Sequence, residues 1–325
     1  MLCNGAARLN TSHPPFWDAL ASALLSGGMT GVSLAMCGSI AAAFASTGAS
    51  SKHVADIFLH IAERVVGDTQ CVAKTPSSCV TLLSAFGKAR YHHAPLFDKL
   101  LSLMDVSYSK FDVTSVLLAC ARVGHDRREV DALLHRLAVS RVWQPPFPSE
   151  INEWSASNML WSLTVLGMLS EHPLLVRKLK RFKHITSPKQ LHPLAAMQLT
   201  QVRATLTRLN ISTYGLPTRK LLADAVAAGS KRDSEFLRFD GSNLQTKVFQ
   251  SLQKMIGSHG IVAVEGEAKL ARRLLSVDVL VTLESGRRVG VEVDGSSHFL
   301  LSDSSKVDGS TRLRNDMLAY LLLDM

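Results

Sequence analysis

Three acidic residues and a histidine near the C-terminus have the residue types and spacing of a metal-dependent hydrolytic site. Asp278 lies in one β-rich run, and Glu292 and Asp294 lie in the next. Side chains alternate along a strand, so Glu292 and Asp294 share a face, and a hairpin between the runs brings Asp278 opposite residue 292 or 293. Grouped carboxylates bind Mg²⁺ in phosphodiester hydrolysis, and His298 is the nearby candidate for proton transfer.

A second group of residues is basic and fits the binding of a polyanion. The chain has a net charge of +9, yet between Glu171 and Asp224 it has no acid over 52 residues, which hold ten Lys and Arg. Such cations repel one another unless an anionic partner neutralises them, and a phosphate backbone does so with an affinity that falls as salt rises. The predicted nucleic-acid contacts are Arg177, Lys178, Lys180, Arg181, Lys183, Lys189, Arg203 and Arg208, with Arg312 and Arg314 near the C-terminus.

The densest part of this basic segment predicts an amphipathic helix from Leu174 to His184. Leu175, Leu179 and Phe182 would form its apolar stripe. The cations would then project from the opposite side, where a phosphate backbone can reach them.

The nature of the nucleic acid is indicated by context. The sequence has no helix-turn-helix, zinc-finger or basic-zipper signature, which favours RNA over DNA. Four side chains are candidates for stacking on RNA bases or, equally, for the protein core: Tyr91, His92, His93 and Trp161.

The residues around the acidic group predict a small α/β module. A first helix is indicated by an apolar face that comprises Leu244, Val248, Leu252 and Met255. Ser242 and Gln245 form a capping-box pattern at its start, and glycines end it. Three β-rich runs follow, at 261–265, 276–283 and 288–295, with a tight turn at 284–287. In the last helix, one face comprises Leu313, Met317 and Tyr320 or Leu321.

The run VGVEVDGSSHF (289–299), together with VDVLV (277–281) and TRLRNDMLA (311–319), resembles a RAP domain. The conserved pattern of that family matches Asp278, Glu292, Asp294, Gly295, His298 and Phe299, and its basic helix matches Arg312 and Arg314. The resemblance covers about residues 243–325. RAP domains typically follow helical-repeat regions, are abundant in apicomplexan parasites and are similar to the FASTK relatives of animal mitochondria. The resemblance therefore implies RNA metabolism in a mitochondrion, or else a plastid, with organellar ribosomal RNA and ribosomal proteins as partners.

The RAP fold is itself similar to that of PD-(D/E)xK nucleases, which makes a Mg²⁺-dependent RNA endonuclease the alternative function. Its metal ligands would be Asp278, Glu292 and Asp294. Two departures count against it, because Asp294 stands where those nucleases have a catalytic Lys, and residues 241–264 contain no acid. The sequence thus favours a module without catalysis or cofactor, in which Asp294 and His298 order a loop.

The N-terminal two-thirds of the chain contain a degenerate repeat. Four segments align, at 39–48, 81–90, 115–124 and 158–167, and their sixth residues are Phe44, Phe86, Cys120 and Leu163. A second apolar-periodic stretch follows each one. A unit of about 35–45 residues with two amphipathic helices is typical of helical solenoids. The alternative is a non-repetitive helical domain.

The composition limits the remaining classes of protein. Cysteines without zinc-ligand spacing favour buried free thiols; they are Cys3, Cys37, Cys71, Cys79 and Cys120. The apolar run 27–51 contains five Gly and many Ser and Thr, so we expect no membrane span there. The N-terminus is poor in acids, but it has too few Arg for a clear transit peptide.

The sequence thus predicts a mainly α protein with a small C-terminal α/β module of restriction-endonuclease-like type. The expected parts are an α-solenoid over 1–210, a linker or extra helix pair over 211–240, and the RAP-like domain over 241–325. We expect an organellar RNA-binding protein with no small-molecule substrate and no membrane partner. A third possibility is a protein-binding helical scaffold, in which charge reversal of the basic segment would change nothing.

Overall fold

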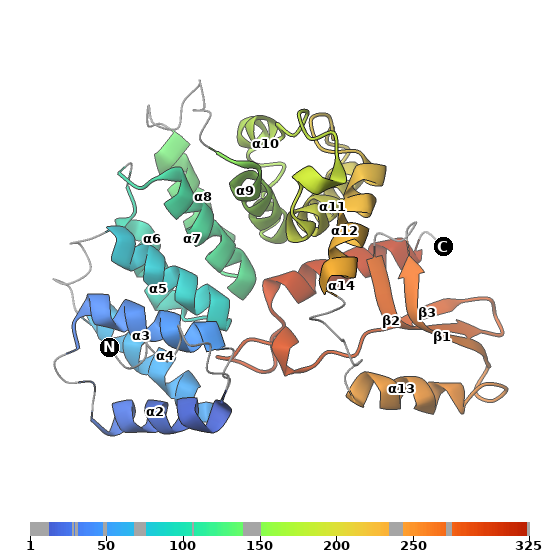
Figure 1. The fold of residues 1–325 in the computed structure, drawn as a ribbon, viewed down its shortest axis with the longest axis horizontal. Helices are drawn as coiled ribbons and strands as arrows, with labels where there is room; N and C mark the ends of the chain where they lie inside the picture. Colours follow the sequence, from blue (N-terminus) through green and yellow to red (C-terminus); the bar gives the residue numbers. More distant parts are fainter. Residues whose placement is uncertain are drawn as a thin grey trace. The chain divides into compact units, whose positions relative to one another are not determined.

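The computed structural model describes residues 13–27, 29, 32–47, 51–67, 76–105, 107–138, 151–233, 243–270 and 275–323. Within these ranges the chain is mainly helical, with thirteen α-helices and one small antiparallel sheet near the C-terminus (Figure 1). This confirms the prediction of a mainly α protein with strands confined to the C-terminal region.

The chain divides into two compact units. The N-terminal unit comprises Met1–Glu171 and Phe299–Ser310, and the C-terminal unit comprises His172–His298 and Thr311–Met325. Residues 172–210, which the sequence assigns to the repeat region, therefore group with the C-terminal unit. The predicted linker or helix pair at 211–240 contains one described helix, and residues 234–242 lie outside the described residues.

The helices of the N-terminal unit pair in two alternating series. Helix α3 packs on α5, α5 on α7 and α7 on α9, while α2 packs on α4, α4 on α6 and α6 on α8. The four aligned segments fall on the first series, and Phe44, Phe86, Cys120 and Leu163 are fully buried. The helices are α2 (Pro14–Ser26), α3 (Leu34–Thr47), α4 (Lys52–Gly67), α5 (Pro76–Ala89), α6 (Ala94–Leu103), α7 (Lys110–Val123), α8 (Arg127–Ala138) and α9 (Glu153–Val165).

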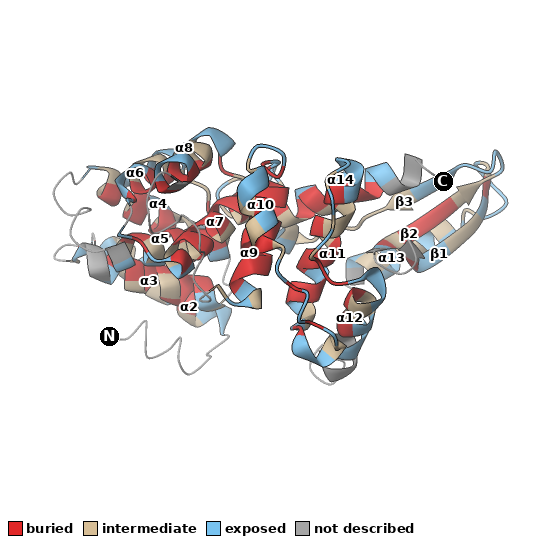
Figure 2. Cartoon of the chain, turned by 90° about the horizontal axis from the view of Figure 1, so that it is seen from above, coloured by how far each residue is buried: buried red, intermediate tan, exposed pale blue. Residues whose placement is uncertain are grey.

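The local sequence explains why these helices begin, end and pack closely. Ser109 and Asp112 form a capping box at the start of α7, and Gly124 ends that helix with a φ of 63°. Gly87 lets α5 approach α7, because a Cβ there would lie 2.5 Å from the Ala119 Cα. Buried residues extend along most of α7 and α9 (Figure 2).

Residues 299–310 belong to the N-terminal unit although they follow the C-terminal sheet in sequence. The Leu301 amide donates to the Arg90 carbonyl at 2.8 Å, and the His92 amide donates to the Ser302 hydroxyl at 3.0 Å. Gly309 lies against α7, where a Cβ would overlap the Ala121 carbonyl. This segment is thus held by backbone contacts to the helical unit.

The C-terminal unit contains a helical part and an α/β part. The helical part has α10 (Pro173–Leu179), the 3-10 helix η2 (Pro188–Gln190), α11 (Pro193–Arg208) and α12 (Arg219–Asp233). The α/β part has α13 (Asn243–Gln253), β1 (Ile261–Leu270), β2 (Leu275–Leu283), β3 (Arg288–Val291), the 3-10 helix η4 (Ser296–His298) and α14 (Gly309–Leu323). The predicted α-β-β-β-α order is confirmed.

The sheet has the order β1-β2-β3 and is antiparallel throughout. The predicted tight turn joins β2 to β3, with Gly286 at a φ of 78°. Val279 and Val281 pack with residues of α13 on one face, and Leu280 packs with Leu318 of α14. Alternation along β2 thus gives each face of the sheet a helix.

Several boundaries differ from the predicted ones. The third strand ends at Val291 rather than at residue 295, so Glu292 and Asp294 lie beyond it. In α14, Leu313 and Met317 are buried as predicted, and Tyr320 is exposed. The side chain of Leu321, the alternative to Tyr320, lies outside the described residues, and Leu318 is buried although it was not predicted. Ser242 of the predicted capping box lies outside the described residues.

Two predictions about composition can be compared with the structure. Cys37, Cys79 and Cys120 are buried and form no disulfide, as predicted, while Cys3 and Cys71 lie outside the described residues. None of the helices in the described ranges combines the length and the apolar character that a membrane span needs.

Candidate nucleic-acid interface

The excess positive charge of the chain belongs entirely to the C-terminal unit. That unit has 22 Lys and Arg against 12 Asp and Glu, whereas the N-terminal unit has 14 against 15. The two halves of the chain therefore differ in electrostatic character, and a polyanion would be attracted to the C-terminal unit.

The predicted helix over 174–184 is shorter than expected. Helix α10 ends at Leu179, and residues 180–186 form an irregular segment. Val176, Leu179 and Phe182 are buried, so Val176 rather than Leu175 begins the apolar stripe. The helix ends there because the chain turns to meet a distant loop at 212–215.

The segments 180–183 and 212–215 are held together as a loop pair. The Phe182 amide donates to the Gly215 carbonyl at 2.9 Å, and the Lys180 ammonium donates to the Ser212 carbonyl. Gly215 has a φ of 92°, and any Cβ on it would overlap the Lys180 carbonyl. Glycine is the residue that tolerates both conditions. We call these two segments the basic loop pair.

Four of the predicted contact residues remain accessible to a ligand: Arg177, Arg181 and Lys189, and Lys183, whose ammonium also contacts Tyr214. All four are exposed. Among the residues that the structure describes, no carboxylate lies within ion-pair distance of any of them. Their charge is thus left for a partner to neutralise.

The other predicted cations are partly used within the protein. Burial lowers the pKa of Lys180, and Arg203 donates to the Pro217 carbonyl at 3.1 Å. Arg208 is exposed and lies 5.9 Å from the centre of the Tyr320 ring. Lys178 is half-buried and Arg312 is exposed. These residues contribute to the field of the unit, and Arg208 remains accessible.

Tyr214 is an aromatic residue in this region that the sequence reasoning missed. It is 73% exposed, the largest exposed fraction among the exposed large hydrophobic residues described. The Lys183 ammonium lies over its ring, 4.2 Å from the centroid, and donates to its hydroxyl. The signal in the sequence was its position inside the acid-free segment, three residues before Pro217.

The predicted acidic group is brought together only in part. Arg314 of α14 contacts Glu292 at 2.6 Å and Asp278 at 3.8 Å. The other Asp278 oxygen accepts from the Val293 amide at 2.8 Å. Val279 pairs with Val291 in the sheet, and this register brings Asp278 close to the residues that follow Val291. Asp294 instead lies 3.4 Å from His298.

Burial raises the pKa of Glu292 to about 7; Arg314 opposes this shift, while Asp278 and then Asp294 add to it. Both Glu292 oxygens are buried, and neither accepts an aligned hydrogen bond from the described residues. His298 is held by Thr311, whose hydroxyl lies 3.1 Å from its Nδ1. The acidic group is therefore a partly buried ion-pair cluster between the sheet and α14.

This cluster does not fit a magnesium centre. The guanidinium of Arg314 lies between the two carboxylates that would have to share the metal, and Asp294 is directed to His298 instead. Over the described part of the chain, no three His, Cys, Asp or Glu side chains come together as ligands. Arg314, predicted as an RNA contact, acts here as the counter-ion of the cluster.

The predicted stacking residues of the N-terminal unit have structural positions. Tyr91 is buried against Phe58 with ring centroids 5.5 Å apart, and Trp161 is buried as well. His93 caps α6 by accepting from the Leu96 amide at 3.2 Å. These residues are thus parts of the core or of a helix cap, which is the second of the two possibilities left open by the sequence.

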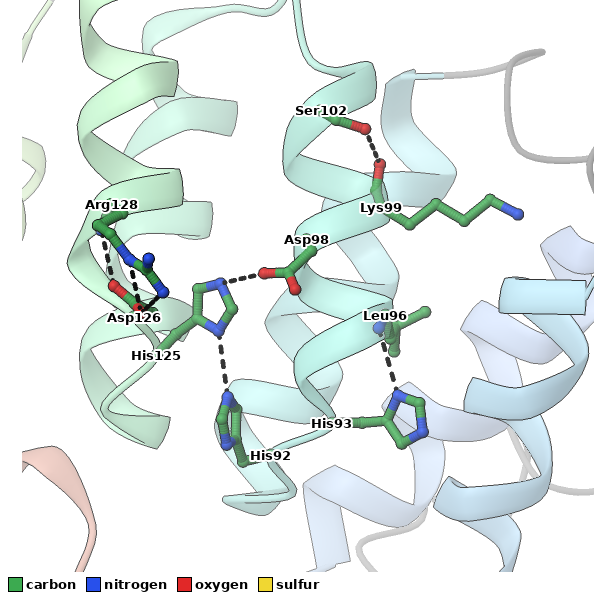
Figure 3. A network of polar contacts seen from close by, with 9 residues as sticks. All are labelled: His92, His93, Leu96, Asp98, Lys99, Ser102, His125, Asp126 and Arg128. Carbon is green, nitrogen blue, oxygen red and sulfur yellow. Dashed lines mark hydrogen bonds and ion pairs between the residues drawn. The ribbon is translucent and has the colours of Figure 1, made fainter.

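His92 belongs to a partly buried polar network in the same unit (Figure 3). Its Nε2 lies 3.1 Å from the Nδ1 of His125, whose own Nε2 lies 3.2 Å from the Asp98 carboxylate. The His125 side chain is 1% exposed. Burial and then the neighbouring His92 lower the pKa of His125 to about 4. The network therefore consists of neutral imidazoles at physiological pH.

No known protein family matches the chain, and no curated protein matches it either.

Proposed function

We propose that this protein binds RNA through its C-terminal unit and does not cleave it. One observation carries the proposal: Arg177, Arg181, Lys183 and Lys189 are exposed in the unit that holds the whole charge excess, and no described carboxylate pairs with them. Unpaired cations gathered on one unit favour a polyanion, and an RNA backbone supplies regularly spaced phosphates.

The architecture is consistent with this proposal. The consecutive packing of α3, α5, α7 and α9 supports a short α-solenoid, because each helix pair covers the apolar face of the next. The α-β-β-β-α order supports the resemblance of the C-terminal module to a RAP domain. Through that resemblance, the RNA would be organellar ribosomal RNA, in a mitochondrion or else a plastid, with ribosomal proteins as neighbours.

Nothing in the geometry favours the endonuclease alternative. Arg314 occupies the place between Asp278 and Glu292, and Asp294 pairs with His298. We therefore propose that the acidic cluster has a structural role in the module and that no Mg²⁺ is used.

The test is the salt dependence of RNA binding by the full chain. Arg181→Glu with Lys189→Glu reverses two exposed cations of the C-terminal unit. Each lost phosphate contact should lower the slope of log K against log salt by about 0.7 for a single strand. We expect this variant to bind oligoribonucleotides more weakly and with a flatter slope, as measured by fluorescence anisotropy.

A matched control carries the same change of net charge on the other unit. Lys52 and Lys88 are exposed in the N-terminal unit, and Lys52→Glu with Lys88→Glu should leave affinity and slope nearly unchanged. An equal loss in both variants would show that the net charge alone governs binding. No RNA binding by the wild-type chain in low salt would refute the proposal.

The identity of the RNA requires a different experiment. Crosslinking the protein to RNA in cells and sequencing the bound fragments tests the organellar assignment. Reads on mature organellar ribosomal RNA would support a ribosome component, and reads at precursor junctions would support a maturation factor. Reads on cytosolic messenger RNA would contradict the assignment.

A further inference from the structure

We infer that Tyr214 is a stacking platform for an unpaired base, so that the ligand of the C-terminal unit is single-stranded rather than duplex RNA. This inference rests on the proposed function. It begins from the position of Tyr214, whose ring is 73% exposed beside the cations of the basic loop pair. Tyr is enriched at interfaces, because its ring is apolar and its hydroxyl is polar.

The loop that carries Tyr214 is held in place from several sides. The Tyr214 amide donates to the Ser212 hydroxyl at 3.2 Å, and the carbonyl of the next residue, Gly215, accepts from the Phe182 amide at 2.9 Å. Because Phe182 is buried, this bond ties the loop to the core of the unit. A ring on a fixed loop loses little conformational entropy when a base stacks on it.

The surroundings of the ring suit a nucleotide. Lys183 lies over the ring at 4.2 Å, and Arg181 is exposed two residues earlier in the basic loop pair. Stacking of a base on an aromatic ring is nearly independent of sequence. The adjacent cations would contact the phosphates on either side of that base. The ring thus matches the base of a nucleotide, and the cations match its phosphate.

The same arrangement discriminates against a duplex. In a base-paired helix both faces of each base are covered by its neighbours, so no face is available to Tyr214. A duplex would be bound through its phosphates alone. The ring should therefore contribute to the affinity for a single strand and not to the affinity for a double strand.

The experiment measures binding of the full chain to two ligands by fluorescence anisotropy. One ligand is single-stranded oligoadenylate, and the other is the duplex that oligoadenylate forms with oligouridylate. Tyr214→Ala should weaken binding of the single strand by about 5- to 150-fold. Because stacking releases no counterions, the salt slope should stay unchanged. Binding of the duplex should stay unchanged too, and Tyr214→Phe should keep most of the single-strand affinity. Phe111→Ala, at a half-exposed aromatic residue of the N-terminal unit, is the matched control.

The outcomes separate this inference from the proposed function. If Tyr214→Ala leaves the single-strand affinity unchanged while Arg181→Glu with Lys189→Glu lowers it, stacking is wrong and RNA binding stands. An equal loss for single strand and duplex also overturns stacking. If the wild-type chain binds neither RNA, both proposals fall. Far-UV circular dichroism of Tyr214→Ala and Tyr214→Phe separates a loss of the ring from a loss of folding.

Discussion

Glu292→Gln should change the stability of the protein in a way that depends on pH. Glu292 is 14% exposed, with Arg314 at 2.6 Å and with the Asp278 carboxylate at the same guanidinium. Two effects compete on its carboxyl group. Burial disfavours the ionised form, while the cation of Arg314 favours it. Burial prevails, and the pKa is raised from 4.5 to about 7.

The direction of the pH effect follows from this raised pKa. Between about pH 4.5 and pH 7 the folded state retains a proton on Glu292 that the unfolded state has lost. The wild-type protein therefore loses stability as the pH rises through this window. This rise in the pKa of Glu292 from 4.5 to about 7 corresponds to about 3 kcal/mol, or about 2 kcal/mol after allowance for the residual exposure. Gln cannot ionise, so the variant avoids this loss.

The measurement is the difference in the free energy of unfolding between variant and wild type at pH 4.5 and at pH 8. Urea titrations followed by far-UV circular dichroism supply it. Glu292→Gln should gain about 2 to 3 kcal/mol relative to wild type between these two pH values. Glu284→Gln, at an exposed acid in the β2–β3 turn, is the control and should show no such gain. If the gain is absent, or if the variant gains stability on acidification instead, Arg314 outweighs burial and the reasoning is wrong.

Two further predictions concern the N-terminal unit, which contains all four tryptophans and so can be followed by their fluorescence. The pKa of His125 is about 4 in the folded state and about 6.5 in the unfolded state. The contribution of neutral His125 to the stability of this unit should therefore be fully present above pH 6.5, and the free energy of unfolding should fall by about 3 kcal/mol as the pH drops to 4. His125→Phe should flatten this pH dependence, and an unchanged slope would assign the dependence to other groups. Gly87→Ala should cost about 1–3 kcal/mol, because its methyl group would lie 2.5 Å from the Ala119 Cα. Gly67→Ala, where an added Cβ would meet no other part of the fold within 4 Å, should change urea stability little, and equal losses in both variants would contradict the close packing of α5 on α7.

The helical part of the fold was predictable because its signal is local and repeated. Phe44, Phe86, Cys120 and Leu163 recur at corresponding places in aligned segments, and each is fully buried. A helix needs only contacts within its own turn and one apolar face to bury. The turn at Gly286 was predictable for the same reason, since glycine at a tight turn between two β-rich runs has few alternatives.

The boundaries that failed were set by tertiary contacts. The apolar stripe after Leu174 continues through Phe182, which is why a helix was expected to continue as well. The structure ends it at Leu179, because the Phe182 amide bonds to Gly215, more than thirty residues later in the chain. In the same way, the third strand stops at Val291 because the Val293 amide donates to the Asp278 side chain rather than to a neighbouring strand.

The candidate site was predictable in its charge but not in its shape. The absence of acids between Glu171 and Asp224 identifies the cations from composition alone. Whether a given aromatic residue stacks on a base or fills the core depends on burial, which residue type does not reveal. Tyr91 and Tyr214 are the same residue type, yet Tyr91 is 7% exposed and Tyr214 is 73% exposed. What separates them is that Tyr91 packs on Phe58, whereas Tyr214 lies on a loop whose glycine neighbour is fixed by a distant segment. A binding surface made from two such segments therefore appears only once the chain is folded.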